Sequence, residues 1–306
     1  MNVIETRALA KHFSRVNALS GITFQVQKGA ITGLIGPNGA GKTTTMKLLL
    51  GLLRPDGGEA FVFEKTPWNN PEVLRKIGVI QERSRFPQNM KTEDYLSRIA
   101  RMYGYVASRG RQVLKEQGLE AALDRPIGKL SAGMQQRFAL AHALIHEPEL
   151  VIADEPTSNL DPQGRNDVLS RVLQANKETG TTFLISSHLL PELSRICDTA
   201  AIMSAGKIMA SGDLQKLYTT FRSQMVRVST DKPHELSERI KLLKYVTGVE
   251  LSGENISVET EEGLGKQLYF EVPKLASEVG AELYGIESKG ASLEELFRRA
   301  VSSDSS

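Results

Sequence analysis

The chain is poor in cysteine and has no long apolar run. Cys197 is its single cysteine, so no disulfide can form within the chain and a reducing compartment is expected. No stretch approaches the roughly 20 apolar residues that span a bilayer, and the segment Leu48–Leu53 is short and contains Gly51. Met1–Arg7 lacks the pattern of a secretory signal. We therefore expect a cytoplasmic protein that reaches a membrane only by docking on a partner.

A large excess of charge of either sign is also missing. The 306 residues include 38 Lys and Arg against 36 Asp and Glu, a net charge of +2, so no nucleic-acid partner is predicted. Hydrophobic residues make up 40% and charged residues 24%, which is ordinary for a soluble globular protein. The length suggests one large domain or two smaller ones.

The most informative segment is a glycine-rich turn that fits the phosphate-binding pattern G-x-x-x-x-G-K-[ST] at every fixed position. It follows an apolar run predicted as a buried strand, Ile31–Ile35, and leads into a predicted helix, Lys42–Leu53. Backbone N–H groups and the positive end of the helix dipole make such a turn an anion site. The residues predicted to contact the phosphates of ATP are Gly36, Pro37, Asn38, Gly39, Ala40, Gly41, Lys42, Thr43 and Thr44.

Two acids extend this site toward metal binding and hydrolysis. Lys42 should reach the β- and γ-phosphates, and the Thr43 hydroxyl should bind Mg²⁺. Asp154 ends the apolar run Leu150–Ala153, where it is placed to hold Mg²⁺ opposite Thr43. Glu155 comes next and is predicted to be the general base that polarises the attacking water.

A histidine follows the next apolar run, Thr182–Ile185. If both runs are strands of one parallel sheet, His188 lies at the carboxyl edge of that sheet, where ligands bind. There we expect it to hydrogen-bond a γ-phosphate oxygen and to help orient the water.

The pattern of elements indicates two domains, residues 1–214 and 215–306. The first part alternates strands and helices, as in a mostly parallel α/β sheet, with a helical insertion over Met90–Gly128. The second part predicts a small α+β domain of order βαββαβ, which favours a ferredoxin-like split βαβ fold. Its predicted elements are strand Met225–Ser229, helix Pro233–Leu243, strands Tyr245–Leu251 and Ile256–Glu259, helix Gly263–Val279, strand Ala281–Ile286 and helix Leu293–Ala300, before a frayed tail, Ser302–Ser306.

A second helix start is predicted near the middle of the chain. Ser131 is typical of an N-cap, with Ala132–Leu144 as the helix body. Such an N-terminus can bind an anion, although a serine cap beside a glycine is common and is weak evidence by itself.

Taken together, these segments resemble the nucleotide-binding subunit of ATP-binding cassette (ABC) transporters, a P-loop NTPase fold, over about residues 1–214. The resemblance implies that Ser131 and Gly133 bind the γ-phosphate of ATP held by a second subunit. Ala132 and Met134 depart from the usual Leu-Ser-Gly-Gly-Gln motif. It also implies a dimer-interface role for Asp161 and stacking of Phe13 on adenine, although an aromatic at that position is also compatible with a core role.

The loop after Ile77–Ile80 is ambiguous. The family places here a glutamine that contacts Mg²⁺ and senses the membrane partner, and both Gln81 and Glu82 are candidates. Counting along the family pattern selects Glu82, a hard oxygen ligand. This Glu, Met134 and the segment Ser292–Phe297 resemble the drug-, antibiotic- and peptide-resistance exporter branch.

The resemblance implies an ABC-type ATPase subunit on the inner face of the cell membrane that powers an exporter through a separate integral membrane permease. Two copies would sandwich two ATP molecules head to tail. The C-terminal domain would be regulatory or would stabilise the dimer. Three alternatives stay open: an import ATPase, which Gln at positions 82 and 134 would favour; a soluble ABC protein acting on ribosomes; and a DNA-repair ATPase of the same fold. The cargo does not follow from the sequence.

Overall fold

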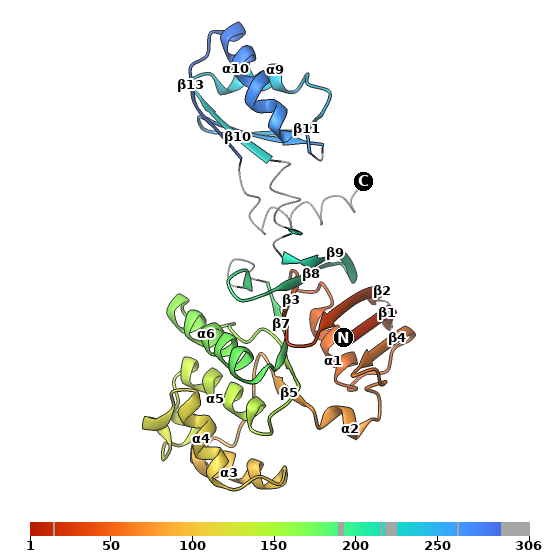
Figure 1. Ribbon diagram of the computed structural model, residues 1–306, viewed down its shortest axis with the longest axis vertical. Helices are drawn as coiled ribbons and strands as arrows, with labels where there is room; N and C mark the ends of the chain where they lie inside the picture. Colours follow the sequence, from red (N-terminus) through yellow and green to blue (C-terminus); the bar gives the residue numbers. More distant parts are fainter. Residues whose placement is uncertain (15, 189–192, 215, 218–224, 262, 289–306) are drawn as a thin grey trace. The chain divides into compact units, whose positions relative to one another are not determined.

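The computed structural model covers the 306-residue chain and describes residues 1–14, 16–188, 193–214, 216–217, 225–261 and 263–288. Internal contacts divide the chain into two compact units, Met1–Gly212 and, within the described part, Asp213–Ser288 (Figure 1). Among the described residues, no helix is both long and apolar enough to cross a membrane.

A six-stranded sheet forms the centre of the first unit. Every residue of its second, third and fourth strands is buried, which explains why each of these strands contains an apolar run in the sequence. The four pairings from the first to the fifth strand of the sheet are parallel, so the predicted mostly parallel sheet is confirmed. In spatial order the strands are β5 (Ile77–Ile80), β6 (Leu150–Ala153), β7 (Thr182–Ser187), β3 (Ile31–Ile35), β8 (Thr199–Ser204) and β9 (Lys207–Asp213).

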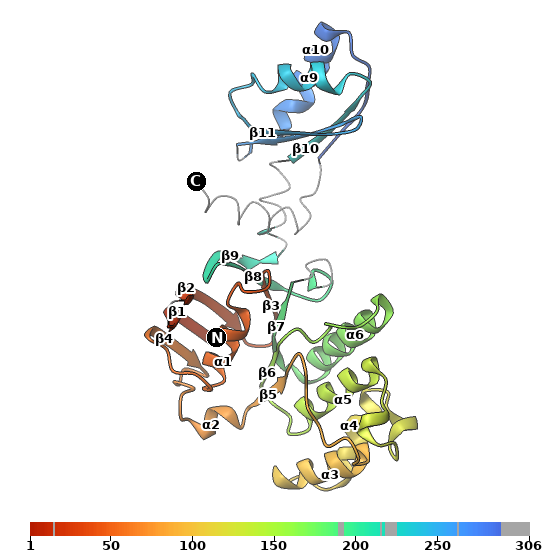
Figure 2. The same ribbon diagram turned by 180° about the vertical axis from the view of Figure 1, so that it is seen from behind.

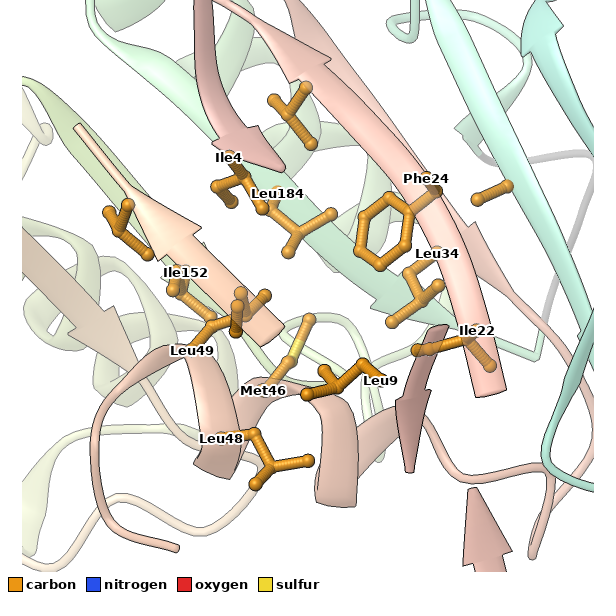
Figure 3. Close-up of a cluster of buried hydrophobic side chains, with 14 of the residues drawn as sticks. Ile4, Leu9, Ile22, Phe24, Leu34, Met46, Leu48, Leu49, Ile152 and Leu184 are labelled. Atoms are coloured by element: carbon orange, nitrogen blue, oxygen red, sulfur yellow. The ribbon is translucent and has the colours of Figure 1, made fainter. Parts of the chain in front are cut away.

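A second sheet, which is antiparallel, is absent from the sequence-based prediction. It has the order β2 (Val16–Gln27), β1 (Asn2–Phe13), β4 (Gly57–Val62). Register shifts along the β1–β2 pair interrupt the alternation in β1 and in the first half of β2, whereas residues 22–27 alternate between apolar and polar. The main core lies between this sheet, the parallel sheet and helix α1; Figure 3 shows Ile4, Leu9, Ile22, Phe24, Leu34, Met46, Leu48, Leu49, Ile152 and Leu184.

Helix α1 is shorter than predicted. It runs from Lys42 to Leu49 and not to Leu53, because Gly51 has a positive φ of 63° and turns the chain out of the helix. A Cβ on Gly51 would come within 2.4 Å of the Pro67 carbonyl oxygen, so another residue type would not fit there. The helix in the structure therefore ends about one turn before the predicted end.

The helical insertion is confirmed. Helices α3 (Thr92–Met102) and α4 (Ser108–Glu116) and two short 3-10 turns lead to α5 (Ala132–Leu144). Their own core includes the fully buried Leu96, Leu114 and Phe138. In both views these helices and α6 (Pro162–Thr179) lie across the parallel sheet from α1 (Figures 1 and 2); the short α2 (Pro71–Leu74) precedes β5.

The second unit has the predicted βαββαβ order. All pairings of its four-stranded sheet are antiparallel, and the spatial order β11-β12-β10-β13 is that of a ferredoxin-like domain. Helix α10 begins after a 3-10 turn, Gly265–Gln267, and α9 ends three residues before the predicted boundary. The predicted helix Leu293–Ala300, the tail and the segment Ser292–Phe297 lie outside the described residues. The elements are β10 (Met225–Thr230), α9 (Pro233–Ile240), β11 (Val246–Ser252), β12 (Asn255–Thr260), α10 (Leu268–Val279) and β13 (Leu283–Ser288).

Candidate functional site

The glycine-rich turn lies between β3 and α1, as its sequence requires. Gly41 caps α1 with a positive φ of 107°, a conformation that L-residues with a side chain rarely adopt. A Cβ on Gly36 would lie 2.4 Å from the Met203 carbonyl oxygen of β8. Gly41 is therefore required by its backbone conformation and Gly36 by the close approach of the β8 backbone. The turn presents the free N–H groups of a helix start.

Lys42 is buried inside this turn. Its Nζ donates hydrogen bonds to the carbonyl oxygens of Gly36, at 2.7 Å, and Pro37, at 3.1 Å. The same Nζ lies 3.2 Å from Glu155 Oε1, and only 6% of the Lys42 side chain is exposed. The loop thus surrounds a desolvated cation, which is what a phosphate group requires of its binding site.

Asp154, the first residue after β6, connects the turn to the strand beside it. The Thr43 hydroxyl donates to Asp154 Oδ2 at 2.8 Å, and the Ser186 hydroxyl donates to Asp154 Oδ1 at 2.6 Å. Among the described residues, no three His, Cys, Asp or Glu side chains gather as a metal site. Mg²⁺ commonly takes one or two protein oxygens and completes its shell with phosphates and water, so Thr43 and Asp154 together suit this ion.

Glu155 lies deeper than Asp154 and is 9% exposed. Its backbone has a positive φ of 48°, which is uncommon for a residue other than glycine and persists only where surrounding contacts hold it. Its Oε2 lies 2.7 Å from Nδ1 of His188, which follows β7. The structure therefore brings Lys42, Glu155 and His188 together in one chain of contacts.

The remaining predicted residues lie on the surface. Ser131 is the N-cap of α5 and accepts a hydrogen bond from the Met134 N–H at 3.3 Å; a Cβ on Gly133 would meet nothing within 4 Å. Asp161 caps α6 by accepting from the Gly164 N–H at 2.7 Å. In the part of the chain that the structure describes, the hydrogen bonds of the Ser131 and Asp161 side chains do not reach the cluster around Lys42.

Phe13 ends β1 and is 43% exposed. The Lys11 Nζ lies 5.5 Å from the centre of the Phe13 ring. The exposure of Phe13 argues against a core role and is compatible with a stacking role.

Gln81 and Glu82 follow β5 and are both exposed. Both border a hollow of about 300 Å³ that Thr43 and Asp154 also line. Glu82 additionally borders a second hollow of about 230 Å³, together with Ala132 and Asn159. Either side chain thus lies near the proposed metal position, and the choice of Glu82 stays a prediction.

Ser186 was not among the predicted site residues. A serine within a buried strand usually signals only a satisfied hydroxyl, and its partners Asp154 and Glu155 are more than thirty positions away in sequence. The one available signal was a polar residue that interrupts an apolar run two positions before His188.

Known proteins share these features. The family model described as ABC transporter matches residues 19–158. The daunorubicin/doxorubicin resistance ATP-binding protein DrrA of Streptomyces peucetius is 34% identical over 251 residues, covering 80% of this chain and 76% of that protein. The Nod factor export ATP-binding protein I of Burkholderia lata is 32% identical over 259 residues, covering 83% of this chain and 84% of the relative.

A solved structure of an ATP-binding subunit of an ABC transporter superposes with a TM-score of 0.63 at 32% identity. The match covers 72% of this chain and 93% of that one. The fold, the phosphate-binding turn and the relatives, which are matched over most of their length, all point to the same family. The chain therefore belongs to the ABC transporter family, as one of its ATP-binding subunits.

Proposed function

We propose that this chain binds and hydrolyses ATP with Mg²⁺ and thereby powers an exporter through a separate membrane-spanning permease. The observation that carries the proposal is the contact of the buried Lys42 with the buried Glu155, and of Glu155 with the exposed His188, beside the Thr43–Asp154 pair. A cation, a carboxylate base and two hard oxygens, from the phosphate-binding turn and the loop after β6, are the groups that phosphoryl transfer to water needs.

Each side chain has a separate task in this reaction. Lys42 holds the β- and γ-phosphates, and its charge offsets the negative charge that develops on them. Thr43 and Asp154 would hold Mg²⁺, which supplies further neutralisation of the phosphate oxygens when it is bound. Glu155 accepts a proton as water attacks the γ-phosphorus and the bond to the bridging β–γ oxygen breaks. His188 contacts Glu155 Oε2 and orients this carboxylate and the water.

The exposed Ser131 and the half-buried Gly133 favour a site shared between two copies of the chain. Both lie at the start of α5, where free N–H groups face solvent and can reach the γ-phosphate of ATP on a second copy. Asp161 would lie at the same interface. Because ATP contacts both halves only in the closed dimer, its binding shifts the population toward closure and hydrolysis releases it.

The names of the two relatives support export as the direction of transport, since one confers drug resistance and the other exports Nod factor. The permease would contact the loop of Gln81 and Glu82, which lines a hollow next to the metal position. The chain would then lie on the inner face of the cell membrane. The second unit, with its own core, would regulate the cassette or stabilise the dimer.

The test is ATP hydrolysis by the purified chain with and without its permease. Mg²⁺-dependent phosphate release is expected, with loss on chelation by EDTA and loss of ATP binding in Lys42→Ala. Lys65→Ala is the matched control, because Lys65 forms an exposed ion pair with Glu72, and it should behave as wild type. ATP-driven efflux from vesicles that contain the permease would support export, whereas uptake would assign an importer. Absence of hydrolysis under all these conditions would refute the proposal.

A further inference from the structure

Ser186 lies at the meeting point of the two acids. It is fully buried in β7. Its hydroxyl donates to Asp154 Oδ1 at 2.6 Å and accepts the backbone N–H of Glu155 at 2.9 Å. The O–H of Ser186 therefore bonds to Asp154, and its oxygen bonds to the next residue, Glu155, in the loop after β6. The parallel register, in which Ala153 lies opposite Ile185, places this loop directly beside Ser186.

The first contact fixes the Asp154 carboxylate. Oδ1 is held by Ser186 while Oδ2 receives the Thr43 hydroxyl, so the carboxylate cannot rotate without losing a hydrogen bond at one end. Hydrogen bonds of this kind orient ligands around metal ions and tune the affinity of a site. Here they keep Oδ2 directed at Thr43, the residue that would share Mg²⁺ with it.

The second contact fixes the backbone of Glu155. A positive φ is strained for a residue with a side chain and persists only where surrounding contacts hold it. The N–H of Glu155 is anchored on Ser186, and its carboxylate consequently lies between Lys42 and His188.

We propose that Ser186 is a positioning residue that sets both the metal-facing orientation of Asp154 and the turn that aims Glu155 at water. The inference rests on the proposed hydrolysis of ATP at this site. Burying a hydroxyl is unfavourable unless its hydrogen bonds are made, and both hydrogen bonds of the Ser186 hydroxyl go to the two acids of the site.

The test measures metal affinity as well as turnover in the full chain. Binding of Mn²⁺ in the presence of ADP is followed by electron paramagnetic resonance for wild type, Ser186→Ala and Ser186→Thr. Loss of the hydroxyl should weaken Mn²⁺ binding by about 10- to 100-fold and lower kcat, with little change in KM for ATP. Threonine keeps a hydroxyl and should restore most of both. If the alanine variant does not fold, Ser186→Cys, which is close in volume and a weak donor, replaces it.

Thr182→Val is the matched control. Thr182 is also fully buried in β7, but it lies at the other end of the strand and accepts the Gly29 N–H at 2.9 Å. This variant should lose thermal stability yet bind Mn²⁺ as wild type does. An unchanged Mn²⁺ affinity in Ser186→Ala, or an equal loss in Thr182→Val, would overturn the positioning role while wild-type hydrolysis stands. A wild type that neither hydrolyses ATP nor binds Mn²⁺ with ADP would instead remove the proposed function and this inference with it.

Discussion

Replacing Glu155 by glutamine keeps the shape of a buried side chain and removes its charge and its basicity. An amide cannot accept the proton that leaves the attacking water. General-base catalysis contributes about 10²- to 10⁴-fold in rate, or about 3 to 5 kcal/mol of activation free energy. We expect kcat to fall by that factor while ATP still binds, because Lys42 and the phosphate-binding turn are intact.

The same substitution should lower stability in a way that ATP reverses. Glu155 Oε1 lies 3.2 Å from the Lys42 Nζ, and the two side chains are 11% and 6% exposed. Breaking a buried pair costs about 3 to 5 kcal/mol, and the lower end applies because two carbonyl oxygens still accept from Lys42. For a unit of about 200 residues, a loss of about 3 kcal/mol lowers Tm by roughly 6 to 12 °C. The phosphates of ATP replace the missing negative charge, so MgATP should raise Tm more in the variant than in wild type.

Phosphate release and thermal unfolding with and without MgATP measure both effects. Glu149→Gln is the control, since Glu149 precedes β6 at its other end and its ion pairs with Lys28 and Lys76 are exposed; such pairs contribute less than about 1 kcal/mol. Normal turnover in Glu155→Gln would remove this residue from the role of base. A Tm equal to that of wild type would show that the pair with Lys42 contributes nothing in solution.

Four further outcomes are expected. Ser131→Arg should reduce hydrolysis on the order of 100-fold while the isolated chain still binds ATP; equal losses in both assays would contradict a shared site. In a reconstituted complex, Glu82→Ala should lower transport-coupled hydrolysis about 10-fold and more than Gln81→Ala, and the reverse order would shift the assignment by one residue. A chain ending at Leu214 should fold and bind MgATP; a folded truncation without ATP binding would make the C-terminal unit part of the cassette. Burial lowers the pKa of His142 to about 4, so the unfolded chain takes up a proton that the folded chain does not. Urea unfolding should then show stability falling by about 3 kcal/mol between pH 6.5 and 4, and His142→Gln should flatten this dependence; an unchanged pH profile in that variant would be the contrary result.

Local chemistry made part of this fold predictable. The turn from Gly36 to Lys42 could be predicted from the sequence because its backbone geometry admits few other residue types. Strands β3, β6 and β7 could be predicted because a strand that is buried on both faces contains a run of apolar residues. Ser131 was predicted as a cap because a helix start needs an acceptor for its free N–H groups.

Most of what escaped prediction depends on contacts between distant segments. The antiparallel sheet was missed although residues 22–27 alternate between apolar and polar, because bulges interrupt the pattern in β1 and in the first half of β2. Helix α1 was predicted too long because Gly51 was interpreted as a residue within the helix, whereas its positive φ ends the helix. The role of Ser186 arises only when β7 pairs with β6. The local signals that the sequence does carry, Gly51 in the predicted helix and the polar Ser186 at the end of an apolar run, do not by themselves specify these features.

In the proposed dimer, each ATP is held between the phosphate-binding turn of one copy and the α5 N-terminus of the other. Mixing two inactive variants tests this arrangement most directly. Lys42→Ala lacks a working turn, and Ser131→Arg lacks a working α5 start. In a mixed dimer the intact turn of one chain meets the intact α5 start of the other. Each variant alone should be inactive, and an equimolar mixture should recover up to about a quarter of the wild-type rate, because half of randomly paired two-fold dimers are mixed and each holds one intact site of two. No recovery in a mixture shown to form mixed dimers would contradict the shared site.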